Sequence, residues 1–165
     1  MRKTVAAVLA LLLSFCALAE SAPFTLRKGI AWGMTLPEVL AAEGNPLYIS
    51  RRENGMEIVR IPDATHEGAP CAVEYLFFRD SLTMARVEYD ASAVTLESVK
   101  DALSKHYGEA TPLTGDQLRE ITFLEALPDS FYGWVLGTDT LVCLTENREA
   151  GTLRILYSDL IDADG

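Results

Sequence analysis

The stretch that decides how the fold begins is GIAWGMTLPEVLAAEGNP, residues 29–46. Thr35 and Glu38 have the spacing of a capping box, in which the threonine hydroxyl accepts a hydrogen bond from the Glu38 backbone N–H and the glutamate carboxylate reaches back to Thr35. Pro37 is tolerated there, because first-turn N–H groups have no partner within a helix. The pattern therefore predicts a helix that begins at Leu36.

The same stretch also encodes the end of that helix. Gly44 can adopt the left-handed conformation that closes a helix, and Pro46 cannot continue one. Gly33 allows the chain to turn sharply before the cap. We therefore expect a tight turn followed by a helix over Leu36–Glu43.

Four strands are predicted after this helix. Asn54-Gly55 is typical of a two-residue hairpin turn, because both residues tolerate the positive φ of a type I′ turn, and a second turn is expected at Arg79-Asp80. Between the two hairpins, IPDATHEGAP at 61–70 is polar, holds two prolines and predicts a loop. Such short connections favour antiparallel pairing. The expected strands are 47–53, 56–61, 71–78 and 81–90.

A second helix and a second group of strands are predicted to follow. Apolar residues repeat at helical spacing from Leu96 to Tyr107, behind Thr95 as an N-cap, and Gly108 ends the pattern. Strands are expected at 119–127, 131–137, 140–146 and 152–158. The order is thus helix-then-strands, twice. We expect an α+β fold in which two short helices pack on one face of an antiparallel sheet, as one domain over 20–165 made of related halves at about 29–90 and 94–158.

The first residues of the chain predict a secretory signal peptide. Arg2 and Lys3 precede an apolar run that is too short to span a bilayer, and Ala17-Leu18-Ala19 offers a cleavage site after Ala19, with Ala22 as the alternative. Cys16 would be a lipid anchor if residues 13–16 were a lipobox, but Phe15 is too large for the position before that cysteine. We expect an exported protein, periplasmic or secreted, with no membrane span.

Two cysteines, Cys71 and Cys143, remain after cleavage. An even number in an oxidising compartment favours a disulfide between them, and the alternative is two buried thiols that behave as small apolar residues.

The net charge argues against polyanionic partners. Removing residues 1–19 takes away two basic residues and no acid, so the formal net charge falls from −10 to −12. Such an acidic surface repels phosphate backbones, which argues against nucleic acid and anionic lipid as partners.

Few residues suggest catalysis. The two histidines, His66 in the polar loop and His106 near the end of the second helix, are expected to be solvated. His66, Glu67 and Cys71 do not have the spacing of a zinc site, so neither a metal nor a cofactor is predicted. No common catalytic motif is present, and we expect no enzyme activity.

Aromatic side chains are the remaining candidates for a binding site. Trp32, Tyr48, Tyr132 and Trp134 occur near turns or strands, where a sheet could present them to a partner. The alternative is a place in the core, which suits Trp134 best because Tyr132 and Leu136 share its face.

One short motif resembles a known group. Gly33-Met34-Thr35, Glu38-Val39 and Gly44-Asn45-Pro46 resemble the G-M-T-x-x-x-V…G-x-P signature of small bacterial envelope domains, which include the small lipoprotein of the outer-membrane barrel-assembly machinery and the β-lactamase-inhibitory protein. The resemblance implies a short helical element packed on an antiparallel sheet.

These observations predict a noncatalytic binding or interaction module of the bacterial envelope. Its partner would be an unidentified envelope protein or a small ligand. The alternatives are an envelope enzyme or enzyme inhibitor, and a structural lipoprotein of the outer membrane.

Overall fold

The computed structural model describes residues 24–112 and 130–160. The predicted signal peptide with Cys16, and the strand expected at 119–127, lie outside these residues. The described helices are η1 (Arg27–Gly29), α2 (Leu36–Glu43) and α3 (Leu96–Tyr107). The strands are β1 (Ile49–Glu53), β2 (Met56–His66), β3 (Ala69–Phe78), β4 (Ser81–Asp90), β5 (Thr111–Pro112), β6 (Ser130–Leu136), β7 (Thr140–Asn147) and β8 (Thr152–Asp159).

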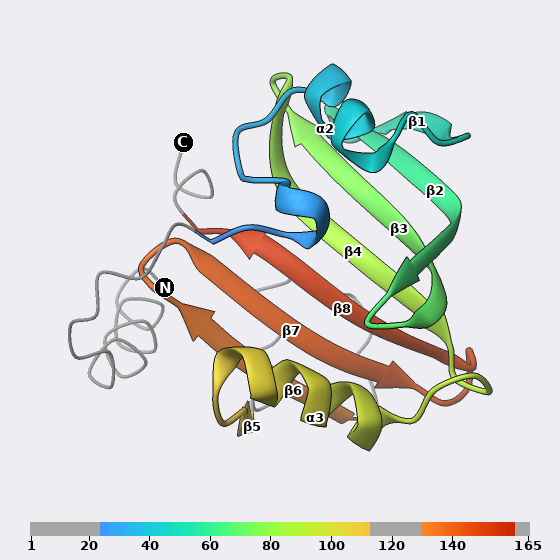
Figure 1. The fold of residues 1–165 in the computed structure, drawn as a ribbon, viewed down its shortest axis with the longest axis vertical. Coiled ribbons are helices and arrows are strands. Elements are labelled where there is room, and N and C mark those ends of the chain that lie inside the picture. The colour runs from blue at the N-terminus through green and yellow to red at the C-terminus, as the bar shows by residue number, and fades with distance from the viewer. Residues whose placement is uncertain (1–23, 113–129, 161–165) are drawn as a thin grey trace.

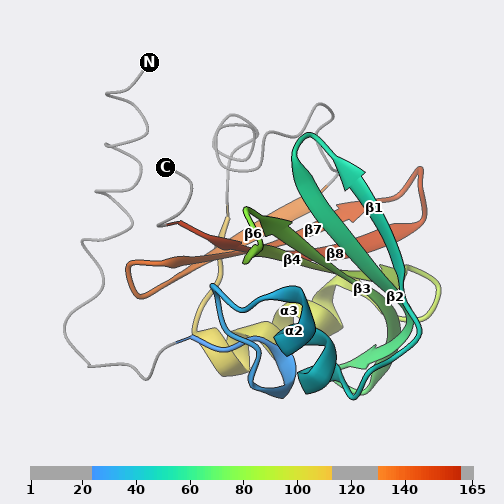
Figure 2. The same cartoon turned by 90° about the horizontal axis from the view of Figure 1, so that it is seen from above.

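All of these strands belong to one antiparallel sheet with the order β1-β2-β3-β4-β8-β7-β6-β5 (Figure 1). The first four strands are neighbours in chain order, and so are the last four. The two groups join where β4 pairs with β8, with Val87 opposite Ile155. The prediction of an antiparallel sheet with two helices is confirmed at this level. Figure 2 shows that the sheet is strongly twisted, so that β1 and β2 run at a steep angle to β7.

Helix α2 has the predicted bounds, from Leu36 to Glu43. The Glu38 carboxylate accepts hydrogen bonds from both the N–H and the hydroxyl of Thr35, each at 2.8 Å. The Thr35 side chain also faces the backbone N–H of Glu38, so the predicted capping box is present. Gly44 ends the helix with φ 86°.

Gly33 docks the turn before α2 onto the sheet. Its φ is 81°, and its N–H donates to the carbonyl of Leu82 over 3.0 Å. The Leu82 N–H donates in return to the carbonyl of Met34 over 2.9 Å. The glycine thus brings the chain against the first residues of β4 as well as into the helix.

The segment 61–70 corrects the sequence analysis, because it is a hairpin of two long strands. β2 continues to His66, β3 begins at Ala69, and the turn between them is Glu67-Gly68. The pairing shifts between Ile61 and Ala64, which is a β-bulge at Pro62 and Asp63. A bulge leaves residues out of the ladder, so it accommodates a proline that a regular strand would reject.

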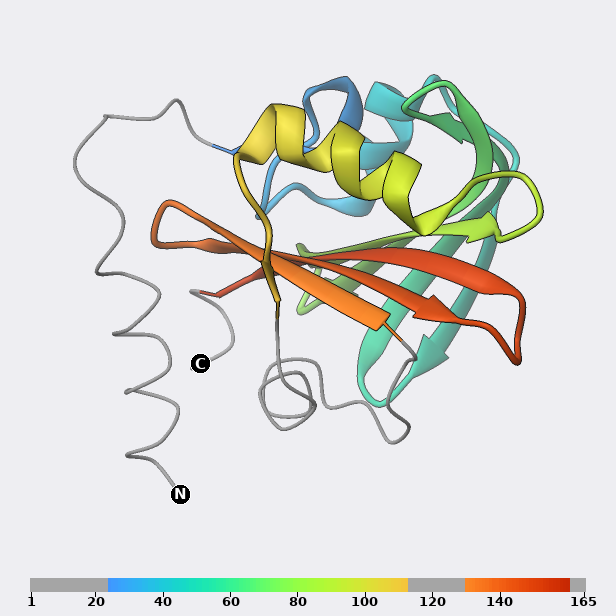
Figure 3. The same ribbon diagram turned by 90° about the horizontal axis from the view of Figure 1, so that it is seen from below.

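The main core combines buried side chains of the sheet with side chains of both helices, α2 and α3. Val39 of α2 and Leu103 of α3 belong to the same cluster of buried side chains as Tyr75, Val87 and Ile155 of the sheet. Figure 3 shows α3 running across the sheet, with η1 beside it.

The structure has no bridge between Cys71 and Cys143; both are free and buried thiols. They lie on β3 and β7, with β4 and β8 in between. Three strand spacings amount to about 14 Å, twice the Cα separation that a disulfide allows. Cys71 also packs in the main core, whereas Cys143 packs with Leu141 in a second cluster. The predicted disulfide is therefore incompatible with this strand order.

Candidate functional site

Two of the predicted contact aromatics are tied to the body of the protein. Trp134 is 3% exposed, and its indole N–H donates to the carbonyl of Gly108 over 3.0 Å. Trp32 is partly buried, and its indole N–H donates to the hydroxyl of Thr140 over 2.8 Å. Trp32 thereby joins the turn before α2 to β7. Both side chains have structural roles.

Tyr132 and Tyr48 differ in how far their side chains are exposed. Tyr132 packs partly buried against the main core, with the Lys100 ammonium 4.6 Å from the centre of its ring. Tyr48 is 45% exposed and lies immediately before β1. Of the four predicted aromatics, Tyr48 is thus the one that the structure leaves accessible.

Tyr48 belongs to an exposed apolar run. Its neighbours Leu47 and Ile49 are 92% and 62% exposed, and together these three are most of the large hydrophobic side chains exposed in the described chain. Neighbouring apolar side chains exposed together are typical of contact surfaces, whereas single ones are common on any protein. We call Leu47, Tyr48 and Ile49 the apolar run.

The apolar run leads into an edge strand. β1 is the first strand of the sheet, and among the described residues it pairs only with β2, so no described strand lies along its other edge. All five residues of β1 are exposed. An open edge presents unpaired backbone N–H and C=O groups to a further strand. The opposite edge, β5, has only two residues, one of which is Pro112.

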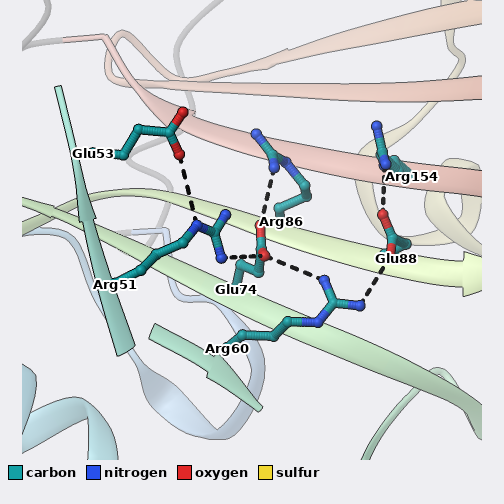
Figure 4. Close-up of polar contacts among 7 residues, drawn as sticks. All are labelled: Arg51, Glu53, Arg60, Glu74, Arg86, Glu88 and Arg154. Atoms are coloured by element: carbon teal, nitrogen blue, oxygen red, sulfur yellow. Dashed lines mark hydrogen bonds and ion pairs between the residues drawn. The ribbon is translucent and has the colours of Figure 1, made fainter. Parts of the chain in front are cut away.

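β1 is held in place by an ion-pair network that runs across neighbouring strands of the sheet (Figure 4). At its centre Glu74 of β3 is 4% exposed. One Glu74 oxygen, Oε1, lies 3.1 Å from Arg51 Nη1 of β1 and 3.2 Å from Arg60 Nη1 of β2. The other, Oε2, lies 2.9 Å from Arg86 Nη1 of β4. A single carboxylate thus connects four adjacent strands.

The network extends to β8 through Glu88. Its Oε1 lies 3.0 Å from Arg60 Nη2, and its Oε2 lies 2.7 Å from Arg154 Nε. Partial burial raises the pKa of Glu88, but the hydrogen bonds from Arg60 and Arg154 outweigh that effect and leave its pKa below the ordinary value. The network connects β1, β2, β3, β4 and β8.

A second polar cluster lies around Glu43, at the end of α2. Its side chain is 2% exposed; Lys28 Nζ lies 2.7 Å from Oε2 and Arg27 Nε 3.1 Å from Oε1. The hydroxyl of Tyr75 also donates to this carboxylate. Burial, reinforced by that hydrogen bond, raises the pKa of Tyr75. The cluster fastens η1 to α2 and to β3.

His66 is the centre of a third cluster, because the β2–β3 hairpin turns its ring inward. Its Nδ1 lies 2.7 Å from the hydroxyl of Tyr89, and its Nε2 lies 3.4 Å from that of Tyr157. Burial lowers the pKa of His66, so the neutral imidazole is favoured. The expectation of a solvated histidine is wrong for this residue. This position depends on the β2–β3 hairpin, where the sequence predicts a loop.

Two adjoining clefts open between these elements. The larger, of about 1120 Å³, lies beside the bulge of β2 and has Arg27, Glu43 and Cys71 in its wall. The smaller, of about 480 Å³, lies where η1, the β2–β3 turn and the end of α3 meet. Across the described ranges no three His, Cys, Asp or Glu side chains are grouped to hold a metal ion. None of the helices described is long and apolar enough to cross a membrane.

Comparison of the chain with protein-family models, with curated proteins and with solved structures finds no match. A function for this chain is therefore inferred from its own residues and geometry.

Proposed function

We propose that this protein is a noncatalytic binding module of the bacterial envelope, exported by the signal peptide that residues 1–19 encode, and that it binds its partner along β1. The observation that carries the proposal is the position of the apolar run, which exposes three consecutive large side chains at the start of β1, a strand with no further described strand along its outer edge.

The partner we propose is an extended segment of another envelope protein, added beside β1 as a further strand. Backbone groups of such a segment would pair with the open edge, and its apolar side chains would cover Leu47 and Ile49. Arg52 is exposed on β1 and makes no ion pair in the described part of the chain, so an acidic residue in the segment would complement it. A second copy of this chain would instead bring arginine-rich strands together.

The ion-pair network supports this function by fixing the edge before the partner arrives. Arg51 binds the buried Glu74 as well as Glu53, so β1 is connected to the middle of the sheet by side chains in addition to its ladder with β2. A strand that is already ordered loses less conformational entropy on binding.

The states of the titratable side chains favour binding over catalysis. Burial raises the pKa of Cys143 to about 12 and raises that of Cys71 as well, so both thiols are protonated and are weak nucleophiles. His66 has a tyrosine hydroxyl at each ring nitrogen.

We also propose that the chain has the two-part architecture expected from the sequence. We infer that α2 with β1–β4 and α3 with β5–β8 are related halves, each with its helix on the same face of the sheet. The supporting observations are the mirrored strand order about the β4–β8 pair and the joint cluster that contains Val39 and Leu103.

The test compares baits in an envelope extract. The mature protein is immobilised beside a double variant, Leu47→Ser with Ile49→Ser, and a control variant, Phe78→Ser, which removes another exposed hydrophobic side chain at the far end of β3. We expect one envelope protein to be retained by the wild type and the control and to be lost from the double variant. Equal retention by all three baits, or a homodimer that the double variant dissociates, would contradict the proposal.

A further inference from the structure

The Asn54-Gly55 turn determines which backbone groups of β1 face its neighbour β2. Glu53 and Met56 lie opposite each other across this two-residue turn, whose residues have φ of 51° and 80°, as a type I′ hairpin requires. The pair that closes such a turn exchanges both of its backbone hydrogen bonds. Along an antiparallel ladder, pairs of this kind alternate with pairs that exchange none. Glu53 is therefore bonded to β2 through its backbone, whereas the backbone groups of Arg52 are not.

The same alternation identifies the backbone groups that point outward. Counting back from Glu53, Arg51 and Ile49 are bonded to β2, and the N–H and C=O groups of Ser50 and Arg52 point away from it. No described strand lies along this side of β1. A strand added here would form its backbone hydrogen bonds with Ser50 and Arg52. Its residues opposite Ile49 and Arg51 would form the other kind of pair, in which the side chains lie closer together.

The two faces of β1 offer different side chains to such a strand. Ile49 is 62% exposed and shares its face with Arg51, whose guanidinium contacts Glu74. Arg52 points to the opposite face, where it is exposed and forms no ion pair with any described residue. A bound strand therefore meets an apolar side chain on one face and the Arg52 cation on the other.

Antiparallel addition continues the pattern of the sheet. Each pairing of neighbouring strands in the described sheet is antiparallel, and antiparallel pairing is slightly more stable per residue than parallel pairing. Residue numbers run in opposite directions along an antiparallel pair, so the residue opposite Ile49 follows the residue opposite Arg52 by three positions. Side chains directly opposite each other stabilise the pair when both are apolar or when they carry opposite charges.

We propose, as an extension that rests on the proposed function, that the segment bound by β1 runs antiparallel to it and carries an acidic residue followed, three positions later, by a large apolar residue. The acidic residue lies opposite Arg52, and the apolar residue lies opposite Ile49. The backbone of the acidic residue exchanges both hydrogen bonds with Arg52, and the residue two positions later does the same with Ser50. Partners of this class have an extended segment with the pattern acidic-x-x-apolar.

The test selects binding peptides on the immobilised mature protein. Random peptides of about eight residues, displayed on phage, are long enough to pair with all five residues of β1. We expect the peptides enriched on the wild type to carry the acidic-x-x-apolar pattern. On Arg52→Glu the acidic position should become basic while the apolar position stays, because opposite charges are favoured between residues that face each other. The control Arg79→Glu changes an exposed arginine in the turn between β3 and β4, and it should select the wild-type pattern.

Backbone methylation of an enriched peptide tests the hydrogen-bonding register. A methyl group on the nitrogen of the acidic residue removes the N–H that donates to the Arg52 carbonyl, and a methyl group two positions later removes the donor to Ser50. Each change should weaken binding at least about tenfold in fluorescence anisotropy titrations, because a hydrogen bond is lost and the methyl group clashes with β1. Methylation of the residue between them should have little effect, because its N–H points away from β1. Replacing the acid by its amide should weaken binding about two- to fivefold.

The results that would overturn the proposed pattern differ from those that would overturn β1 as the binding edge. Peptides with the reversed order apolar-x-x-acidic, an acidic position that is unchanged on Arg52→Glu, or equal effects of all three methylations would contradict the pattern and leave the edge in place. Peptides that bind the double variant Leu47→Ser with Ile49→Ser as tightly as the wild type would contradict the edge and the pattern together. A selection on the wild type that enriches no peptide would also contradict the pattern. The wild-type selection and the methylated peptides decide the matter even if Arg52→Glu fails to fold.

Discussion

Replacing Glu74 by glutamine tests whether the ion-pair network fixes the edge of the sheet. The change keeps the size of the side chain, removes its charge and turns one of its two acceptor oxygens into a donor. Arg51, Arg60 and Arg86 now share those two oxygens over 2.9 to 3.2 Å. In the variant, at least one guanidinium would face an N–H group and lose its partner.

The expected loss in the free energy of unfolding depends on how deeply the carboxylate and the three guanidinium groups are buried. Removing one partner of a fully buried ion pair costs about 3–5 kcal/mol. Here the carboxylate is 5% exposed, but the arginines are 31–45% exposed and can turn towards water. We therefore expect Glu74→Gln to lower the free energy of unfolding by about 2 kcal/mol.

Glu53→Gln is the matched control in the same network. Glu53 is 58% exposed and has one contact, 3.6 Å from Arg51 Nε, so we expect a cost of about 0.5 kcal/mol or less. Urea unfolding of the wild type and both variants gives the free energies. Amide hydrogen exchange should also become faster in β1 of Glu74→Gln than in β1 of Glu53→Gln. If the two variants are equally stable and exchange β1 amides at equal rates, the network does not hold the edge.

Three further predictions concern capping, pH and thiols. Thr95→Ala should cost about 1 kcal/mol, because the Thr95 hydroxyl accepts from the N–H of Ser98 over 3.2 Å. Thr35→Ala should cost about as much, because it removes the capping box at the start of α2; thermal unfolding of both variants checks this. The pKa of His66 is lower in the folded protein than in the unfolded chain, so as the pH falls below about 6.5 the unfolded chain takes up the proton first and the folded state loses stability. Urea midpoints measured from pH 7.5 to 5 should therefore decrease, and they should decrease less in His66→Gln. Periplasmically expressed protein should show two reactive thiols when denatured without reductant and none when native, and a thiol count of zero after denaturation would restore the Cys71–Cys143 bridge.

The parts of the fold that depend on local signals were predictable. The helix bounds Leu36–Glu43 follow from a proline in the first turn and from Gly44. The hairpin turn at Asn54-Gly55 has positive φ at both residues, 51° and 80°, as expected from their identities. Each of these features is determined by residues within one turn of the chain.

The errors came from features that neighbouring residues do not determine. Pro62 indicated a loop, but a β-bulge accommodates it within β2. The number of cysteines suggested a bridge, but the strand order places β4 and β8 between the two thiols. His66 and His106 are 40 positions apart in the chain, and only the long β2–β3 hairpin brings them to the same cleft.

Photo-crosslinking in the intact cell tests most directly whether β1 is the edge that contacts the partner. A photoreactive phenylalanine analogue is placed at position 47, in the apolar run, and in a second strain at Asp101, which is exposed on α3. We predict one discrete, larger adduct from position 47, containing another envelope protein, and no such adduct from position 101. Adducts of equal yield from both positions, or an adduct from position 101 alone, would contradict the assignment of β1 as the binding edge.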